Sequence, residues 1–259
     1  MTNEEQEYRN SPYLNQSGMK KILLSPAHYQ AWLTQQLEPE EPEKELRIGL
    51  ATHCLSLQPE RFDADFAVAP VVDRRTTLGK QVWANFLENS PGKLCLTAEE
   101  YTVARHCADS VLRNSIFKKC ISSEGAIVEK SLFVKDDIFR HGMKGRLDLI
   151  APAEQTIVDI KTHGKELSVY EIQKSIRNNK YHLQELVYKI LCAKNNIDIS
   201  SFVFIFVEKK EPFSSVSVVI ENRFTKKEAA DLMTMSVDAF NTCMDTGVWT
   251  DLSDVIIQA

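Results

Sequence analysis

The residues best suited to catalytic chemistry are two aspartates and a lysine in the segment KGRLDLIAPAEQTIVDIKT. Asp148 lies in the first of two short β-rich stretches, and Asp159 and Lys161 lie in the second. Side chains alternate between faces along a strand, so Asp159 and Lys161 share one face. Paired carboxylates are suited to a hard divalent cation, because Mg²⁺ prefers carboxylate oxygens. With an ammonium group beside it, such a site could hydrolyse a phosphodiester through a metal-activated water.

The pairing register of the two stretches decides whether Asp148 joins the other two side chains. If Asp148 lies opposite Asp159, one face of the hairpin is wholly apolar. A shift by one residue would mix charged and aliphatic side chains on both faces, which a buried sheet disfavours. We therefore predict that the two carboxylates lie together. The predicted apolar face consists of Leu147, Leu149, Val158 and Ile160, and the predicted polar face of Arg146, Asp148, Asp159 and Lys161, with Ile150 and Ile157 nearer the turn.

Two facing carboxylates repel each other, and burial increases this cost or raises the pKa of one of them. A divalent cation removes the repulsion. Lys161 could then orient or deprotonate a metal-bound water, or neutralise phosphate charge. The alternative is that Asp148 and Asp159 are ordinary solvated residues at strand ends, since the tripeptide D-x-K is common. The matched hairpin favours the metal site.

Two further side chains are candidates for the same site. Glu129 lies in the β-rich stretch AIVEKSLFV before the hairpin, and could complete a cage of three carboxylates. His53 lies in the apolar segment RIGLATHCLSL, where a single histidine is more often a core residue than a ligand. Imidazole is a poor ligand for Mg²⁺, so a histidine ligand would indicate that Mn²⁺ can also serve. The plainer alternative for Glu129 is an exposed strand residue.

A stripe of polar and aromatic residues follows in the helical segment NKYHLQELVYKIL. Tyr181, Gln184 and Tyr188 are spaced at i, i+3 and i+7, beside the apolar stripe of the same helix. This stripe could line a cleft next to the carboxylates, with Gln184 holding a water or an oxygen of the cleaved strand. The alternative is an amphipathic shoulder without a binding role.

A compact basic segment, DRRTTLGKQVW, lies in the first half of the chain. It places Arg74, Arg75 and Lys80 close to a tryptophan. Such a cluster could contact the phosphates of a nucleic acid, because basic side chains supply most of that affinity. Ordinary surface charge is the alternative for all three residues.

The elements that position these residues alternate as in an α/β protein. N-caps at Ser17 and at Ser25, the latter followed by Pro26, predict two short N-terminal helices. The apolar run over residues 202–207 is typical of a central strand buried on both faces. The sequence thus predicts a mixed sheet with helices around it. Helices are predicted over residues 46–57, 79–90, 97–120, 168–194 and 225–246, and strands over residues 127–134, 145–150, 156–162, 202–207 and 216–220.

Composition limits the class of protein. The 259 residues are 43% hydrophobic and 26% charged, which excludes collagen-like, disulfide-scaffold and wholly disordered chains. No apolar run is long enough for a membrane span, and the N-terminus lacks the chemistry of a signal peptide. Six scattered cysteines indicate reduced thiols, so we expect a cytoplasmic protein with no membrane partner. The net charge of −5 decides nothing about nucleic acids, because residues 1–45 hold most of the acidic excess.

We expect one domain over residues 1–259. A helical N-terminal segment with the acidic linker LEPEEPEKE would occupy residues 1–45, and the core would occupy residues 46–259. No internal repeat is present, and phosphate-binding glycine loops, zinc-type cysteine pairs and dinucleotide-binding fingerprints are absent.

A series of motifs over nearly the whole chain occurs in a familiar order and spacing. They are LNQSGMKKILLSPAHYQAWL, GLATHCLSLQPERF, DRRTTLGKQVWANF, VEKSLF, KGRLDLI, VDIKT, YHLQELVY and TGVW. In these motifs the chain resembles the PD-(D/E)XK nuclease domain of the exodeoxyribonuclease VIII (RecE-like) family, common in phages and prophages. The resemblance implies a restriction-endonuclease-like core, with a central mixed β-sheet flanked by helices.

The resemblance also implies an activity. Members of the family are Mg²⁺-dependent exonucleases that degrade linear double-stranded DNA from 5′ ends. They leave 3′ single strands for a single-strand-annealing protein in recombination, and they can assemble as homo-oligomeric rings. The implied metal-site residues are His53, Glu129, Asp148, Asp159 and, through its carbonyl, Ile160; the implied catalytic lysine is Lys161, and the implied cleft-lining residues are Tyr181 and Gln184.

Two other hypotheses compete with that of a RecE-like exonuclease. A Cas4- or AddB-like nuclease would bind an iron–sulfur cluster through one upstream cysteine and three cysteines near the C-terminus. Only Cys192 and Cys243 follow the D-I-K motif, so the required ligands are not arranged that way. A non-catalytic or structure-specific DNA-binding protein on the same fold is the alternative from a different class.

Overall fold

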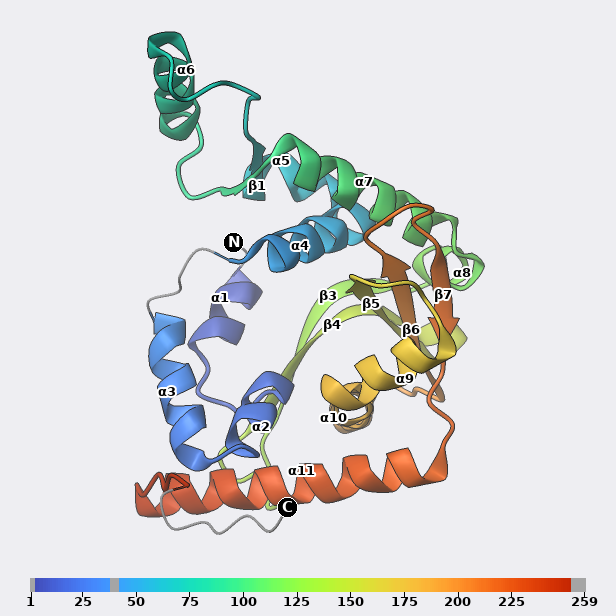
Figure 1. Cartoon of the computed structure of the whole chain (residues 1–259). Coiled ribbons are helices and arrows are strands. Elements are labelled where there is room, and N and C mark those ends of the chain that lie inside the picture. The colour runs from blue at the N-terminus through green and yellow to red at the C-terminus, as the bar shows by residue number, and fades with distance from the viewer. Residues whose placement is uncertain (1–2, 38–41, 253–259) are drawn as a thin grey trace.

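Among residues 3–37 and 42–252, which the computed structural model describes, the main β-sheet contains five strands in the order β3-β4-β5-β6-β7 (Figure 1). β5 and β6 are parallel and the other neighbouring pairs are antiparallel, so the sheet is mixed as predicted. The strands are β3 (Ile127–Val134), β4 (Met143–Ala151), β5 (Thr156–His163), β6 (Ser201–Glu208) and β7 (Ser215–Val218).

Helices surround this sheet, and the predicted helical N-terminal region is present. Residues 38–41 of the predicted acidic linker lie outside the described residues. None of the described helices combines the length and the apolar character needed to cross a membrane. The helices are α1 (Asn3–Asn10), α2 (Gln16–Ile22), α3 (Pro26–Leu37), α4 (Lys44–Leu57), α5 (Phe62–Asp65), α6 (Thr77–Glu88), α7 (Ala98–Arg113), α8 (Ser115–Ile121), α9 (Val169–Asn178), α10 (Tyr181–Lys194) and α11 (Arg223–Thr246).

Several helix boundaries differ from the prediction, and three of these differences can each be traced to one residue. The N-cap of α2 is Asn15, not Ser17, since the Asn15 side chain accepts a hydrogen bond from the Gly18 N–H at 2.7 Å. The helix predicted over residues 97–120 is divided at Asn114, which leaves the helical conformation and caps α8. The helix predicted over residues 168–194 is divided at Lys180, whose φ of 51° is left-handed. Tyr181 is therefore the first residue of α10.

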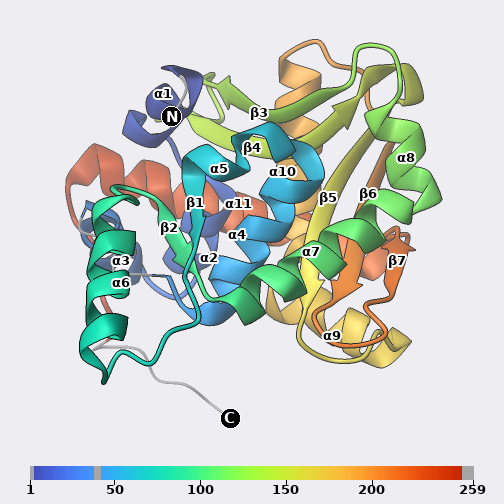
Figure 2. The same cartoon turned by 90° about the horizontal axis from the view of Figure 1, so that it is seen from above.

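Both faces of the sheet are covered by helices (Figures 1 and 2). On one face, the phenylalanines of β6 pack with apolar side chains of α10 and α11. On the other face, the valines and the isoleucine of β6 pack with side chains of α7 and α8. The strand is therefore buried on both sides, which confirms the prediction made from its uninterrupted apolar run.

A small parallel sheet and a projecting helix form an arm that the sequence did not predict as a unit. β1 (Phe66–Val68) pairs with β2 (Leu94–Leu96), and α6 lies in the connection between them. In Figure 1, α6 stands away from the rest of the molecule. Only Gly79 of α6 is buried, so the apolar side chains of this helix lie outside the main clusters.

The hairpin of β4 and β5 has the predicted register where the strands pair, with Leu149 opposite Val158, but the paired ladder covers only Leu149–Ala151 and Thr156–Val158 and stops before Asp148 and Asp159. One part of the face prediction is wrong, because Leu147 packs on the α10 side of the sheet and Leu149 on the other. β3 is irregular at the same level, where Glu129 has a φ of 52° and the pairing with β4 is interrupted between Val128–Leu149 and Lys130–Leu147. The alternation of side chains along β4 therefore breaks at Asp148, opposite this irregularity.

Close packing between β4 and α10 provides a test of this arrangement. A Cβ atom at Gly145 would lie 2.6 Å from Leu191 Cδ1 and 2.9 Å from Tyr188 Cε1. We expect Gly145→Ala to lower the free energy of unfolding by about 1–3 kcal/mol, because an overpacked core must shift. Gly49→Ala is the control, since its Cβ would meet only Thr162 Oγ1 at 3.4 Å. A helical Gly→Ala change there should stabilise by about 0.5–1 kcal/mol. Urea denaturation measures the free energy of unfolding of both variants. Equal stability of Gly145→Ala and wild type would show that β4 and α10 do not pack closely at Gly145.

Candidate active site

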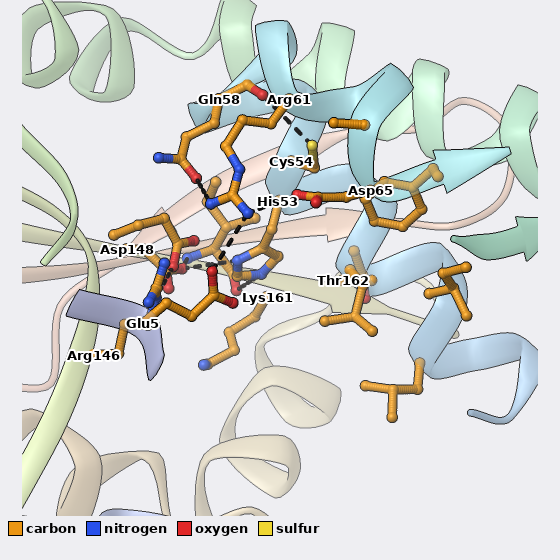
Figure 3. Close-up of a pocket in the computed structure, with 18 of the residues that line it drawn as sticks. Glu5, His53, Cys54, Gln58, Arg61, Asp65, Arg146, Asp148, Lys161 and Thr162 are labelled. Carbon is orange, nitrogen blue, oxygen red and sulfur yellow. Dashed lines mark hydrogen bonds and ion pairs between the residues drawn. The ribbon is translucent and has the colours of Figure 1, made fainter. Parts of the chain in front are cut away.

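A pocket of about 900 Å³ opens beside the ends of β4 and β5 (Figure 3). It lies between these strands, α4 and α1, and the base of the arm closes one side. Its lining includes most residues that the sequence singled out. They are His53, Glu129, Asp148, Ile160, Lys161 and Tyr181.

Three of the lining residues form a cluster that could hold a cation. One ligand atom from each of His53, Glu129 and Asp148 lies within 4.8 Å of the others. Glu129 reaches the cluster from the distorted position in β3, and its carboxylate accepts a hydrogen bond from Arg146 Nε at 2.7 Å. The structure therefore brings together residues that are 19 to 95 positions apart in the sequence.

Asp148 is fixed by the backbone of the neighbouring strand. Its Oδ2 atom accepts a hydrogen bond from the Ile160 N–H at 2.8 Å and lies 3.3 Å from His53 Nδ1. His53 Nε2 lies 2.9 Å from the Ile160 carbonyl oxygen. A carbonyl can only accept, so Nε2 carries a proton in this arrangement.

This geometry tests whether the residues fit a metal ion. With its proton on Nε2, a neutral His53 directs the lone pair of Nδ1 toward the Asp148 carboxylate. Two acceptors at 3.3 Å need a proton or a cation between them. Carboxylate oxygens with one imidazole nitrogen are donors suited to Mn²⁺, and the two carboxylates also suit Mg²⁺. The residues present therefore fit a divalent cation.

The electrostatics of Asp148 indicate the same need. Burial, with the nearby Asp159 and Glu129 carboxylates, raises the pKa of Asp148 to about 7, although His53 and Lys161 act in the opposite direction. The ionised form of Asp148 is therefore disfavoured relative to an ordinary aspartate, and added positive charge would favour it.

Asp159 is placed differently from the prediction. Its side chain is fully buried, its Oδ2 atom accepts a hydrogen bond from Gln184 Nε2 at 2.6 Å, and its Oδ1 atom lies 2.5 Å from Lys161 Nζ. Asp159 is thus not among the three clustered residues. Asp159 is nevertheless near enough to Asp148 for its negative charge to raise the pKa of Asp148. Gln184 was predicted to line the cleft, but it is not among the residues that line the pocket. It is buried and holds Asp159 in place.

Lys161 is held in its charged form. Burial disfavours the ammonium, but the carboxylates of Asp159 and Asp148 outweigh it and raise the pKa of Lys161. The Nζ atom also lies 4.8 Å from the centre of the Tyr181 ring, which is itself packed against phenylalanines of β6. A protonated lysine donates hydrogen bonds and does not accept a proton, so its role here is electrostatic.

The structure adds residues that sequence reasoning missed. Glu5 of α1 enters the pocket and lies 3.4 Å from Arg61, which also pairs with Asp65 at 2.8 Å (Figure 3). Glu5 precedes Arg61 by 56 residues, and no local pattern indicated the contact. Arg146 was placed on the polar face of the hairpin, but its partner Glu129 was not identified.

The predicted DNA-binding residues lie on the arm and do not line the pocket. Arg74 stacks on Trp83, with its guanidinium 4.4 Å from the ring centre, and Arg75 pairs with Asp73 at 3.1 Å. Lys80 is exposed on α6. Their contact with DNA stays a prediction.

The raised pKa of Asp148 predicts a pH-dependent stability in metal-free protein. A carboxyl group whose folded-state pKa is raised binds its proton more tightly when folded, so wild type gains stability as the pH falls from 8 through 7 towards 4. Asp148→Asn removes this dependence and should stabilise at pH 8 by an amount on the order of 1–4 kcal/mol. Urea denaturation in chelator between pH 4 and pH 8 measures the difference. The exposed Asp137→Asn is the control, and a difference between Asp148→Asn and wild type that is independent of pH would refute the assignment.

Comparisons with known proteins agree with this architecture. No curated protein matches the chain in sequence. A crystal structure of a "putative exonuclease" from Eubacterium rectale is similar, with a TM-score of 0.65 and 14% identity, over 98% of this chain and 88% of that chain. At this identity the likeness shows the fold, which confirms the expected restriction-endonuclease-like α/β core. Residues 15–256 match the family described as a PDDEXK-like domain of unknown function (DUF3799). The chain therefore belongs to this PDDEXK-like family.

Proposed function

We propose that the protein is a metal-dependent nuclease that hydrolyses phosphodiester bonds of linear double-stranded DNA. The observation that carries the proposal is the cluster of His53, Glu129 and Asp148 beside the D-I-K motif. Membership of a PDDEXK-like family supports it, and so does a structural neighbour whose name includes the word exonuclease.

Each residue of the site has a distinct role in this proposal. His53, Glu129 and Asp148 would hold the cation, joined by Asp159 and the Ile160 carbonyl as the family resemblance implies. A bound divalent cation would polarise the phosphodiester and lower the pKa of a water. Gln184 positions Asp159 through its hydrogen bond, which keeps that carboxylate beside Lys161.

Lys161 would neutralise phosphate charge or orient the attacking water. Because the neighbouring carboxylates keep it protonated, it would act as a hydrogen-bond donor and not as the base. Tyr181 lines the pocket beside it and would limit where the cleaved strand can lie.

The finer features of the proposal come from the family resemblance. We propose an exodeoxyribonuclease that uses Mg²⁺, with Mn²⁺ as a substitute, and that acts from 5′ ends to supply 3′ strands to a single-strand-annealing protein. A homo-oligomeric ring, a cytoplasmic location and a single domain over residues 1–259 belong to the same proposal. Arg74, Arg75 and Lys80 on the arm would contact the DNA backbone.

Activity on labelled DNA tests the nuclease proposal. Wild type with Mg²⁺ or Mn²⁺ should release nucleotides from a linear, 5′-labelled duplex and leave a closed circle intact. Asp159→Ala and Lys161→Met should each reduce the rate by at least about 10²-fold. The first removes a proposed carboxylate ligand of the cation, and the second removes the ammonium that would stabilise the charge of the reacting phosphate. Asp137→Ala and Lys135→Met are matched controls at exposed positions and should cleave like wild type. Cleavage of the circle would indicate an endonuclease, and equal rates for Asp159→Ala and wild type would refute the proposal.

Metal binding separates the nuclease from a non-catalytic DNA-binding protein on the same fold. Calorimetry with Mn²⁺ and Mg²⁺ should show a specific site in wild type. Asp148→Asn and Glu129→Gln should each weaken binding by at least about tenfold, because a carboxylate ligand is lost. Asp137→Asn should bind as wild type does. The absence of any cation binding that depends on Asp148 would favour the non-catalytic protein.

A further inference from the structure

A second lysine lies at the Tyr181 ring, contributed by a different part of the chain. Lys20 of α2 places its Nζ atom 5.7 Å from the centre of this ring, and Lys161 lies 4.8 Å from the same centre. The two ammonium groups are close enough that Lys161 lowers the pKa of Lys20. Two cations therefore meet at one aromatic side chain that lines the pocket.

Lys20 differs from the other basic residues near the pocket in its partners. Arg61, Arg146 and Lys161 each pair with a carboxylate. Within residues 3–37 and 42–252, Lys20 forms no ion pair, and its ammonium lies over the ring of Tyr181. Burial lowers the pKa of Lys20 to about 8, with Lys161 and Lys180 adding to the effect and Asp159 opposing it. A half-buried ammonium without an anion is unfavourable for the fold.

The helix that carries Lys20 is firmly held. Met19 and Ile22 of α2 are buried in the main core cluster. Gly18 packs so closely that a Cβ atom there would lie 2.7 Å from the Tyr29 ring, and Asn15 caps the helix. The backbone that carries Lys20 is thus held in place beside Tyr181, and Lys20 is partly buried there, whereas the adjacent Lys21 is exposed. Such preorganisation is typical of a residue that binds a ligand.

We propose that Lys20 binds a backbone phosphate of the DNA substrate, next to the phosphate at the metal cluster and beside Tyr181. The inference rests on the proposed nuclease function and extends it with a phosphate-binding residue. A phosphodiester supplies the anion that Lys20 lacks, and the desolvated surroundings strengthen the contact. Lys161 already shares its charge with Asp159, whereas Lys20 has no carboxylate partner among the described residues and adds a second ammonium for an incoming strand.

The alternative is that Lys20 only stabilises the fold through its contact with Tyr181. The two roles predict opposite effects of Lys20→Met, which keeps the length of the side chain and removes the charge. If Lys20 only stabilises the fold, Lys20→Met should lower the melting temperature. A substrate-binding cation would lower DNA affinity, while the melting temperature stays equal or rises, because an unpaired ammonium is no longer buried.

Fluorescence anisotropy with a labelled linear duplex, in chelator and at several salt concentrations, measures the effect on the full chain. Lys20→Met should weaken binding by about tenfold and reduce the slope of log K against log salt by about one, as expected for one lost phosphate contact. Lys20→Arg should retain most of the affinity. Lys21→Met removes the same charge from the same helix and should change affinity less than Lys20→Met. The melting temperature of each variant is measured in parallel.

Two results would overturn the inference. In the first, Lys20→Met binds DNA as tightly as Lys21→Met and the slope of log K against log salt is unchanged. In the second, Lys20→Met has both a lower DNA affinity and a lower melting temperature. The assay does not depend on cleavage. If wild type binds DNA through Lys20 but cleaves nothing, the nuclease proposal fails and this inference stands. If wild type cleaves DNA and Lys20→Met binds normally, only this inference fails, and a wild type that does not bind DNA contradicts both.

Discussion

The concentration of negative charge at the ends of β4 and β5 is the constraint on which the site depends. Glu129 is compensated by Arg146 and Asp159 by Lys161, each through a direct ion pair. Asp148 has only a backbone N–H and an imidazole, and its pKa is raised to about 7. Asp148 is therefore uncharged in much of the protein at neutral pH, and a divalent cation at the cluster would favour its ionised form.

The sheet holds these like charges together because its strands cannot move apart. β5 and β6 pair in parallel over eight residues; β6 is buried on both faces, and β5 is buried from Thr156 to Ile160. α10 packs on β4 at Gly145. The same helix begins at Tyr181 and carries Gln184, which donates a hydrogen bond to Asp159. The break at Lys180 matters for this reason, because a continuous helix from residue 168 would place Tyr181 and Gln184 on a different axis.

The sequence contains the alternation of the hairpin, so the register of β4 and β5 and the approach of Asp148 to Asp159 could be predicted from it. The break in alternation between Leu147 and Leu149, at the level of the positive φ of Glu129, was not predicted, because a regular period of two carries no sign of a local irregularity in the sheet. The orientation of Gln184 was also beyond prediction, since periodicity places a residue on a stripe but does not choose its hydrogen-bond partner. The contact of Glu5 with Arg61 joins distant segments, and only the assembled fold brings them together.

The N-terminal segment is a structural part of the site, although its sequence separates it from the core. Leu14 joins β4 through hydrogen bonds to the Gly142 carbonyl at 3.1 Å and from the Lys144 N–H at 2.9 Å. The buried Lys144 ammonium donates to the carbonyls of Tyr8 and Ser11, which fixes the end of α1. Glu5, which pairs with Arg61, lines the pocket, and Lys20 lies over Tyr181, another lining residue. Both residues belong to segments anchored to the strand that carries Asp148, so in our proposal residues 3–22 contribute to binding the same substrate as the D-I-K motif.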